Sequence, residues 1–297
     1  MKDSTSPVVV GVDGTDDAIQ AARWAGAVAL TLEVPLHIVH AKPYPGHNLS
    51  DAAAAARASE MSALNEAARE ILRAAELAVR GDSDDLRITV AHVPDTADRL
   101  LVDLSQHASL IVLGCEDVSV GAAILIGSIT VAVAANAMCP VVAWRGETSA
   151  LTGQPIVLGV DGDDDSRVAI TTAFELADRF GVDLVAVHAW STLRSAGDVT
   201  LPYMTDWDAV KADQHEHLQN ALAPWTRLHP EVDVEYVIDR DKPSRSLLHQ
   251  SKGAQLVVVG SRGHGPLAGA LLGSTGLNLL HHSAIPTMIC RSVHNDR

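Results

Sequence analysis

A glycine-rich stretch, GSRGHGPLAGALLGST, occupies residues 260–275 and directly follows a short apolar run. Its first glycines let backbone N–H groups approach an anion closely and accept a positive φ without strain. Its arginine adds positive charge, and the final Gly-Ser-Thr would begin a helix whose free N–H groups and dipole favour phosphate. We therefore predict a phosphate-binding loop. Its candidate residues are Gly260, Arg262, Gly263, Gly273, Ser274 and Thr275.

A second polar feature, Asp161-Gly162, follows an earlier apolar run. In an open parallel sheet, ligands bind beyond the carboxyl ends of the strands, where the winding direction reverses. If the strands that end near Asp161 and Gly260 are neighbours at that point, both features face one crevice. The Asp161 carboxylate has no reason to bind phosphate, but it can accept hydrogen bonds from ribose hydroxyls or a base amine. The two features together indicate a nucleotide.

Several common phosphate-binding and catalytic motifs do not occur in the sequence. There is no GxxxxGK[ST] loop, no GxGxxG after the first strand of either half and no GxSxG. A flexible surface turn is the competing interpretation of an isolated glycine-rich loop. The position of this loop after a predicted strand, and the Gly-Ser that begins the next helix, favour nucleotide binding.

The sequence also repeats itself, which sets the domain organisation. VVVGVDG at 8–14 recurs as IVLGVDG at 156–162, and LIVLG at 110–114 recurs as LVVVG at 256–260. The first offset is 148 residues and the second is 146, so the halves differ by one small length change. A period this long indicates a duplicated domain joined by the polar segment RGETSALTGQ. The predicted domains are residues 1–147 and 148–297.

Each half alternates strand-like and helix-like patterns, which predicts an α/β fold with a parallel sheet covered by helices on both faces. The strands are short β-branched runs with little alternation, as is typical of strands buried on both faces. Helices are predicted at 51–80 and 205–228; Gly81 should stop the first, and Pro224 should kink or break the second. In the first half, strands are predicted at residues 7–13, 35–41, 86–93, 109–114 and 139–144.

On these motifs the chain resembles the tandem universal stress proteins of the actinobacterial type, over nearly its whole length. The ATP-binding subclass of that family carries G-x2-G-x9-G-[ST], which Gly260, Gly263, Gly273 and Ser274 match. The resemblance implies two Rossmann-like (adenine nucleotide alpha hydrolase-like) domains, each with a five-stranded parallel sheet. It also implies ATP as a ligand, with or without Mg²⁺, slow or no hydrolysis, and a regulatory role in stress or dormancy. Homodimers that pair through the fifth strands are a further implication.

The resemblance also assigns roles to single residues. By position, Asp161 and Val187 would hold the adenosine side of the nucleotide, and the glycine-rich stretch would hold the phosphates. Many members carry Ser or Thr where this chain has Gly276, so the chain departs from the family at one phosphate hydroxyl. Slow hydrolysis would involve Arg262 and Ser274. A slow ATPase or nucleotidyl transferase, and an interaction scaffold without an obligatory ligand, are the rival functions.

The first half keeps only part of the nucleotide-binding pattern. Where the second half has Arg262 and Gly263, the first half has Glu116 and Asp117. A carboxylate 4 Å from a phosphate charge costs about 1 kcal/mol in water and about 4 kcal/mol at an effective dielectric of 20. Since about 1.4 kcal/mol is tenfold in affinity, we predict that the first half keeps the fold but binds ATP more weakly than the second half, by about a hundredfold or more. The residues of the pattern that it retains are Asp13, Gly114, Gly127 and Ser128.

Four other groups of titratable residues give weaker indications of function. His215-Glu216-His217 lies on a predicted helix, where residues two apart face different directions, so we predict a solvated surface rather than a metal site. His40 and His188 end the second strand of each half and are predicted to pack or to bind one backbone group. Asp163-Asp164-Asp165 suits a helix N-terminus better than a metal site. The carboxylates that follow Cys115 should raise its pKa, which predicts an unreactive thiol.

The composition sets the broad class of protein. Hydrophobic residues make up 47% and aromatic residues 3%, so the cores must consist mainly of Ala, Val, Leu and Ile. The 22 Lys and Arg against 37 Asp and Glu give a net charge of −15, which disfavours binding to nucleic acid or to an anionic membrane. Three widely spaced cysteines indicate neither a disulfide framework nor a zinc ribbon. With no apolar run long enough for a membrane span and no signal-peptide pattern, we expect a cytoplasmic protein.

Overall fold

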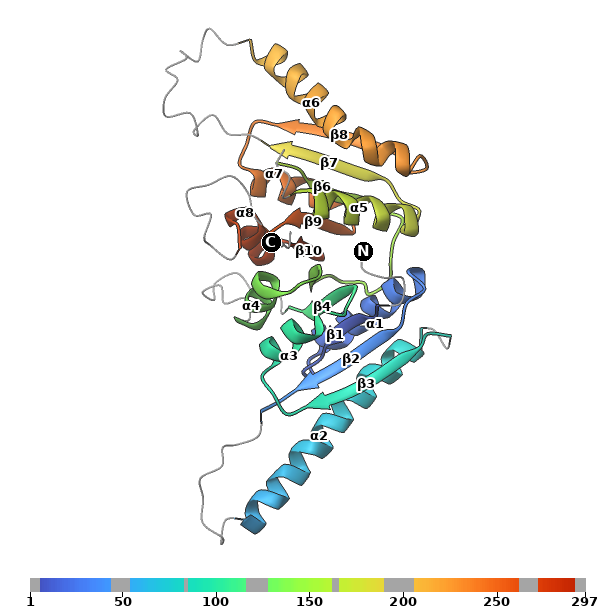
Figure 1. Ribbon diagram of the computed structural model, residues 1–297, viewed down its shortest axis with the longest axis vertical. Helices are drawn as coiled ribbons and strands as arrows, with labels where there is room; N and C mark the ends of the chain where they lie inside the picture. Colours follow the sequence, from blue (N-terminus) through green and yellow to red (C-terminus); the bar gives the residue numbers. More distant parts are fainter. Residues whose placement is uncertain are drawn as a thin grey trace, which may run out of the picture. The chain divides into compact units, whose positions relative to one another are not determined.

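The computed structural model divides the chain into two compact units, Met1–Leu151 and Thr152–Arg297. Figure 1 shows strands flanked by helices in each unit. The residues that the structure describes are 6–43, 54–82, 85–115, 128–161, 166–189, 206–261 and 272–291.

Unit 1 contains a parallel sheet whose strands lie in the order β3-β2-β1-β4-β5. The strands in its described residues are β1 (Val8–Gly11), β2 (Leu36–Ala41), β3 (Ile88–Val93), β4 (Leu110–Gly114) and β5 (Val141–Trp144). The helices in the same residues are α1 (Asp16–Thr31), α2 (Ala54–Arg80), α3 (Ala97–Leu104) and α4 (Ser128–Asn136).

Unit 2 repeats this arrangement, with the parallel order β8-β7-β6-β9-β10. The strands in its described residues are β6 (Ile156–Gly159), β7 (Leu184–Ala189), β8 (Val234–Asp239), β9 (Leu256–Gly260) and β10 (Thr287–Cys290). The helical segments there are α5 (Arg167–Phe180), α6 (Trp207–Leu228), α7 (Pro243–Gln250), the short 3₁₀ helix η4 (Ser251–Gly253) and α8 (Ser274–His282).

The helices of each unit cover both faces of its sheet. In unit 1 the chain winds from β1 through β2 to β3 and then returns to the other side of β1 as β4 and β5. Because such crossovers are right-handed, reversing the winding direction moves the helices to the opposite face. Accordingly α1 packs against α2, and α3 packs against α4. In unit 2, α5 packs against α6 and α7 against α8. The predicted fold, two tandem Rossmann-like domains with parallel sheets, is confirmed.

The burial of the strands follows their position in the sheet. The central strands β4 and β9 are buried at every residue except the final glycine, Gly114 or Gly260. The edge strands β3 and β8 are largely half-buried or exposed. Continuous apolar runs in the sequence therefore mark the strands that are covered on both faces.

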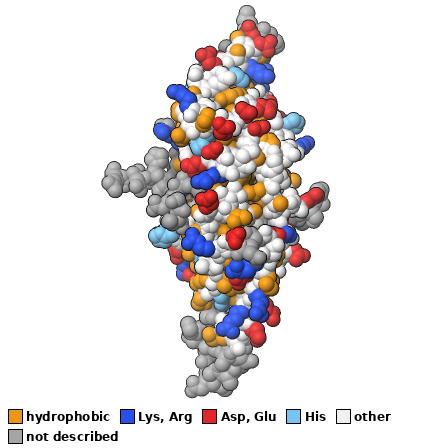
Figure 2. All heavy atoms as spheres, turned by 90° about the vertical axis from the view of Figure 1, so that its right-hand side faces the viewer, with side chains coloured by type: hydrophobic (Ala, Val, Ile, Leu, Met, Phe, Trp, Pro, Cys, Tyr) orange, Lys and Arg blue, Asp and Glu red, His pale blue; other side chains and the backbone are white. Residues whose placement is uncertain are grey.

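On the face shown in Figure 2, acidic and basic side chains are interspersed over the described surface.

The two predicted long helices are present, with one correction. α2 ends at Arg80, and Gly81 follows it with its N–H donating to the Leu77 carbonyl at 3.0 Å, so the predicted stop is confirmed. Of the kink or break predicted at Pro224, the break is wrong, because α6 continues through that residue. Next to it, the Thr226 hydroxyl donates back to the Ala223 carbonyl at 3.1 Å, a local bond that a sequence pattern does not reveal.

Within the described residues, no helix combines the length and the apolar character needed to cross a membrane.

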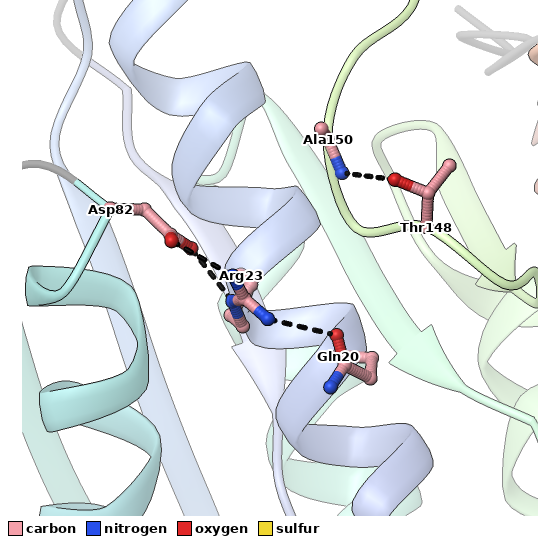
Figure 3. A network of polar contacts seen from close by, with 5 residues as sticks. All are labelled: Gln20, Arg23, Asp82, Thr148 and Ala150. Atoms are coloured by element: carbon pink, nitrogen blue, oxygen red, sulfur yellow. Dashed lines mark hydrogen bonds and ion pairs between the residues drawn. The ribbon is translucent and has the colours of Figure 1, made fainter.

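A paired charge links α1 to the end of α2 in unit 1 (Figure 3). Arg23 Nε donates to Asp82 Oδ2 at 2.7 Å, and Arg23 Nη2 donates to Asp82 Oδ1 at 2.8 Å. Arg23 Nη1 lies 3.4 Å from Gln20 Oε1. The hydrogen bond from the guanidinium holds the pKa of the Asp82 carboxyl below its ordinary value of 3.8. This two-pronged geometry is the favourable form of a surface ion pair.

We expect Asp82→Asn to lower the free energy of unfolding by about 0.2–1 kcal/mol near neutral pH, because the pair is partly exposed and screened by solvent. A depressed carboxyl pKa stabilises the fold above the unfolded-state value of 3.8, and this contribution is lost as the pH falls below it. Denaturant unfolding at several pH values measures the difference. Asp85→Asn, which removes an exposed carboxylate three residues away, is the control. Equal effects of the two variants at neutral pH would contradict the assignment.

Candidate functional site

The carboxyl ends of β6 and β9 lie side by side in unit 2. The two strands pair in parallel with Val157 opposite Val257 and Leu158 opposite Val258, while β7 pairs with the other edge of β6. The chain leaves β6 toward β7 and returns to the opposite side of β6 as β9, so its winding reverses between them. This is the place where open parallel sheets bind ligands. The predicted adjacency of the strands that end near Asp161 and Gly260 is thus confirmed.

Asp161 follows β6 and is held by groups from two other elements. Val160 N–H donates to the Val187 carbonyl at 3.0 Å, which ties the chain before Asp161 to β7. His188 Nδ1 donates to the Val160 carbonyl at 2.9 Å, so this nitrogen carries the proton. The Ser166 hydroxyl donates to Asp161 Oδ1. The half-buried carboxylate therefore has a fixed backbone and a fixed oxygen.

The two strand-end histidines have the same role in both units. In unit 1, His40 Nδ1 donates to the Val12 carbonyl at 2.7 Å, as His188 does to Val160. The predicted single backbone partner is confirmed for each. Val187, predicted on the adenosine side, has a buried side chain, and its carbonyl accepts the Val160 N–H.

The glycine-rich stretch leaves the end of β9 and returns to it. Ser261, which follows Gly260, donates its N–H to the Cys290 carbonyl at 2.7 Å. Twelve residues later along the sequence, Gly273 N–H donates to the Ser261 carbonyl at 2.8 Å. Arg262 and Gly263 lie outside the described residues. The two described ends of the stretch are thereby fixed beside each other and beside β6.

α8 begins at this returning end and offers backbone N–H groups. Gly273 is its N-cap, with φ −67° and ψ 153°; as a glycine it supplies no capping side chain, and the first turn contains no acidic residue. Ser274 is exposed and Thr275 is half-buried. The first N–H groups of a helix lack intrahelical acceptors, and the helix dipole adds partial positive charge. The start of α8 is therefore suited to an anion such as phosphate.

A side chain at Gly276 would point away from the start of α8. A Cβ added there would lie 3.3 Å from Ile289 Cδ1, on the side of β10. The corresponding residue of unit 1, Thr130, is buried, and its hydroxyl lies 3.6 Å from Cys115 Sγ at the end of β4. A hydroxyl at this helix position in unit 1 thus faces the interior. The departure at Gly276 consequently has little bearing on the start of α8.

Unit 1 has the same backbone frame but different contacts at the corresponding place. Asp13 Oδ1 accepts hydrogen bonds from Thr15 N–H at 3.0 Å and from the Thr15 hydroxyl at 2.7 Å, so its carboxylate is turned back onto its own loop. The first turn of α1 lies against the end of β4, since a Cβ on Gly114 would be 2.7 Å from the Asp17 carbonyl carbon and oxygen. Ser128 begins α4, as predicted from its alignment with Ser274.

Cys115 in unit 1 has a raised thiol pKa, as predicted from the sequence, although the main cause is different. Burial raises the pKa most, and the negative charge of Asp17 adds to it. The Thr130 hydroxyl and the positive charge of Arg145 act in the opposite direction. The two carboxylates that follow Cys115 lie outside the described residues. A buried thiol with a raised pKa is a poor nucleophile, which agrees with an unreactive cysteine.

Several residues that the sequence analysis singled out lie outside the residues that the structure describes. These are Gly127, Gly162, Arg262 and Gly263, together with Glu116, Asp117 and the Asp163–Asp165 run. Among the described histidines, His215 packs edge-on against Tyr236, with ring centroids 5.6 Å apart. Across the described part of the chain, no three His, Cys, Asp or Glu side chains gather closely enough to hold a metal ion.

Sequence reasoning did not assign the residues that hold the two aspartates. Thr15 and Ser166 bond carboxylates at different sequence separations, two residues and five residues. The repeat alignment places Ala18 opposite Ser166, and this difference is the sequence signal that could have indicated a contact of Ser166 with Asp161.

Comparisons with known proteins agree with the fold of the two units. A family described as "Universal stress protein family" matches residues 5–145 and 153–291. A universal stress protein of Mycobacterium tuberculosis is 35% identical over 301 residues, covering 97% of each chain. A universal stress protein of Mycolicibacterium smegmatis is 32% identical over 290 residues, covering 96% of each chain. The crystal structure of a universal stress protein from Archaeoglobus fulgidus aligns with a TM-score of 0.68 at 16% identity, covering 98% of this chain and 99% of that one.

We expect Gly114→Ala to lower the free energy of unfolding of unit 1 by about 1–3 kcal/mol. The new Cβ would lie 2.7–2.8 Å from backbone atoms of Asp17 and Ala18, which cannot move without shifting α1. Denaturant unfolding measures the loss. Gly81→Ala is the control, because its Cβ would make only ordinary contacts at 3.5 Å. If Gly114→Ala were as stable as the control, α1 would not pack as closely against β4 as described.

Proposed function

The chain belongs to the universal stress protein family, and on that basis we propose that it binds ATP at the carboxyl edge of the unit 2 sheet. Bound nucleotide acts in this proposal as a regulatory ligand in the response to stress or in dormancy. A homodimer, a cytoplasmic location and a Mg²⁺ ion on the phosphates are parts of the same proposal.

One observation supports the site above all others. The hydrogen bond from Gly273 N–H to the Ser261 carbonyl brings the start of α8 to the end of β9, next to the strand that carries Asp161. A nucleotide has an anionic end and a hydroxyl-rich sugar, and this edge of the sheet offers a partner for each. In our proposal the phosphates bind the backbone N–H groups of α8 and of the glycine-rich stretch, and Arg262 neutralises part of their charge.

The adenosine would lie on the other side of the same edge, toward β7. Asp161 accepts hydrogen bonds from it, and the chain around Val160 and Val187 forms the wall beside it. The carboxylate is suited to hydroxyl donors and unsuited to phosphate, so the orientation of the nucleotide follows from the charges.

We propose that unit 2 holds the strong site and that unit 1 is a degenerate copy. Glu116 and Asp117 replace Arg262 and Gly263, which exchanges a cation for two anions near the phosphates. Asp13 is bonded by Thr15 of its own loop, whereas Asp161 accepts a hydrogen bond from the Ser166 hydroxyl. Repulsion and the loss of the cation both weaken phosphate binding in the first copy.

Catalysis is secondary in this proposal. The motif supplies groups that bind phosphate and no positioned base, which matches a ligand that is held rather than consumed. Slow hydrolysis assisted by Arg262 and Ser274 is one alternative, and a scaffold that works without nucleotide is the other. Phosphate release above that of an Arg262→Ala control would support the first alternative.

The direct test is the nucleotide content of the purified chain. Mass spectrometry of the nucleotide released on denaturation identifies the ligand, and titration calorimetry gives its stoichiometry. We expect one adenine nucleotide per chain. Two equivalent sites would contradict the proposed asymmetry, and the absence of any binding would favour the scaffold.

A charge introduced into the glycine-rich stretch should abolish the strong site. We expect Gly263→Asp to weaken ATP binding about tenfold or more, because it installs the carboxylate that unit 1 carries at the corresponding position. Calorimetric titration of the full chain measures the affinity. Gly253→Asp adds the same charge at an exposed residue before β9, at the opposite end of that strand, and should leave the affinity unchanged. Equal affinities of the two variants would rule out phosphate binding at the stretch.

A further inference from the structure

We propose that Ser166 positions the Asp161 carboxylate to read a ribose hydroxyl, so that the unit 2 site selects ribonucleotides over deoxyribonucleotides. This inference rests on the proposed function and deepens it, because it names the part of the ligand that the site distinguishes. Ser166 acts through Asp161 and is a positioning residue rather than a ligand contact.

The backbone around the two aspartates is held identically in both units, which makes unit 1 an internal control. Val12 N–H donates to the Val39 carbonyl at 2.9 Å, as Val160 N–H does to Val187 at 3.0 Å. A histidine Nδ1 then donates to the carbonyl of the same valine, at 2.7 Å in unit 1 and 2.9 Å in unit 2. Any difference between the aspartates therefore arises in their side-chain contacts.

The groups that bond the two carboxylates come from different places in the chain. Asp13 Oδ1 is bonded by the N–H and hydroxyl of Thr15, two residues away in the same turn, and Asp13 is exposed. Asp161 Oδ1 accepts instead from the Ser166 hydroxyl at the start of α5, and Asp161 is half-buried. In unit 1, Ala18 occupies the position of Ser166 and has no hydroxyl to offer. The Asp161 carboxylate thus has a contact from the start of α5 that the Ala18 side chain cannot give to Asp13.

The Ser166 hydroxyl bonds Asp161 and does not cap α5. Serine at a helix N-cap ordinarily accepts a hydrogen bond from a backbone N–H of the first turn. Thr15 does so in α1, accepting from Ala18 N–H at 3.3 Å. Ser166 has helical backbone angles, φ −72° and ψ −16°, and makes no such bond in α5. The residue is 4% exposed, so its hydroxyl donates to Asp161 rather than to solvent.

A carboxylate fixed in this way suits a hydroxyl donor. Hydrogen bonds to a charged acceptor are stronger than those between neutral groups, and they need the acceptor to be oriented before the ligand arrives. A site built to bind a hydroxyl rejects an analogue that lacks it, because the acceptor is left desolvated without a donor. Ribose carries two such hydroxyls, and each deoxyribose lacks one of them. The position of Ser166 therefore bears on which sugar is bound.

The test compares dissociation constants for ATP, 2′-deoxyATP and 3′-deoxyATP, measured by calorimetry on the full chain. We expect the wild type to bind ATP about tenfold or more tightly than at least one deoxy analogue. In Ser166→Ala this ratio should fall to about threefold or less, with weaker binding of ATP and little change for that analogue. A ratio compares two ligands on one protein preparation, so partial loss of folded protein does not alter it.

Three variants sharpen the comparison. Ser166→Thr keeps the hydroxyl and should restore the preference. Thr15→Ala removes the hydroxyl that bonds Asp13 in unit 1 and should leave the preference unchanged. In an Asp161→Asn background, Ser166→Ala should have no further effect on the ratio, because residues that act as a unit are not additive.

Each outcome has a separate meaning. An undiminished preference in Ser166→Ala, or an equal loss of affinity for all three nucleotides, would overturn this inference and leave the proposed site in place. Failure of the wild type to bind ATP would overturn the proposed function and this inference with it.

Discussion

A single backbone hydrogen bond, from Gly273 N–H to the Ser261 carbonyl, closes the glycine-rich stretch onto the end of β9. The features of the candidate site depend on this closure. It fixes the start of α8, whose first N–H groups have no acceptors within the helix. It does so at the edge where β9 pairs with β6, so the start of α8, which we propose binds phosphate, lies at the edge next to the strand that precedes Asp161. Without the return of the chain to this point, a glycine-rich loop would be only a surface turn.

Duplication allows each contact of the site to be compared within one chain. The backbone frame around the first-strand aspartate is the same in both units, down to the valine carbonyl and the histidine that donates to it. The side chains on that frame differ. Unit 1 packs α1 closely against Gly114 and holds Asp13 within its own turn, whereas unit 2 engages Asp161 from the start of α5. In the proposed function, these changes of side chain on a retained frame distinguish the degenerate copy from the binding copy.

Much of the fold could be predicted because its determinants are local or repeated. The runs that became β4 and β9 are apolar at each position before the closing glycine, which is the pattern of a strand covered on both faces. Gly81 marked the end of α2 correctly. The break that Pro224 suggested does not occur, because a proline removes one N–H but the surrounding helix can keep its remaining bonds and pack around it. The raised pKa of Cys115 was predicted in direction but attributed to sequence neighbours, whereas burial is the larger cause.

The sequence by itself determined the duplicated α/β architecture, the positions of the glycine-rich stretch and of Asp161, and the exchange of charge between the halves. These are properties of composition and order along the chain. Only the tertiary structure decided which hydroxyl holds each aspartate, Thr15 or Ser166, and how closely α1 approaches Gly114. Hydrogen bonds require distances near 3 Å between atoms, and such distances depend on how a helix begins and packs on its sheet. Spacing in the sequence restricts those distances but does not set them.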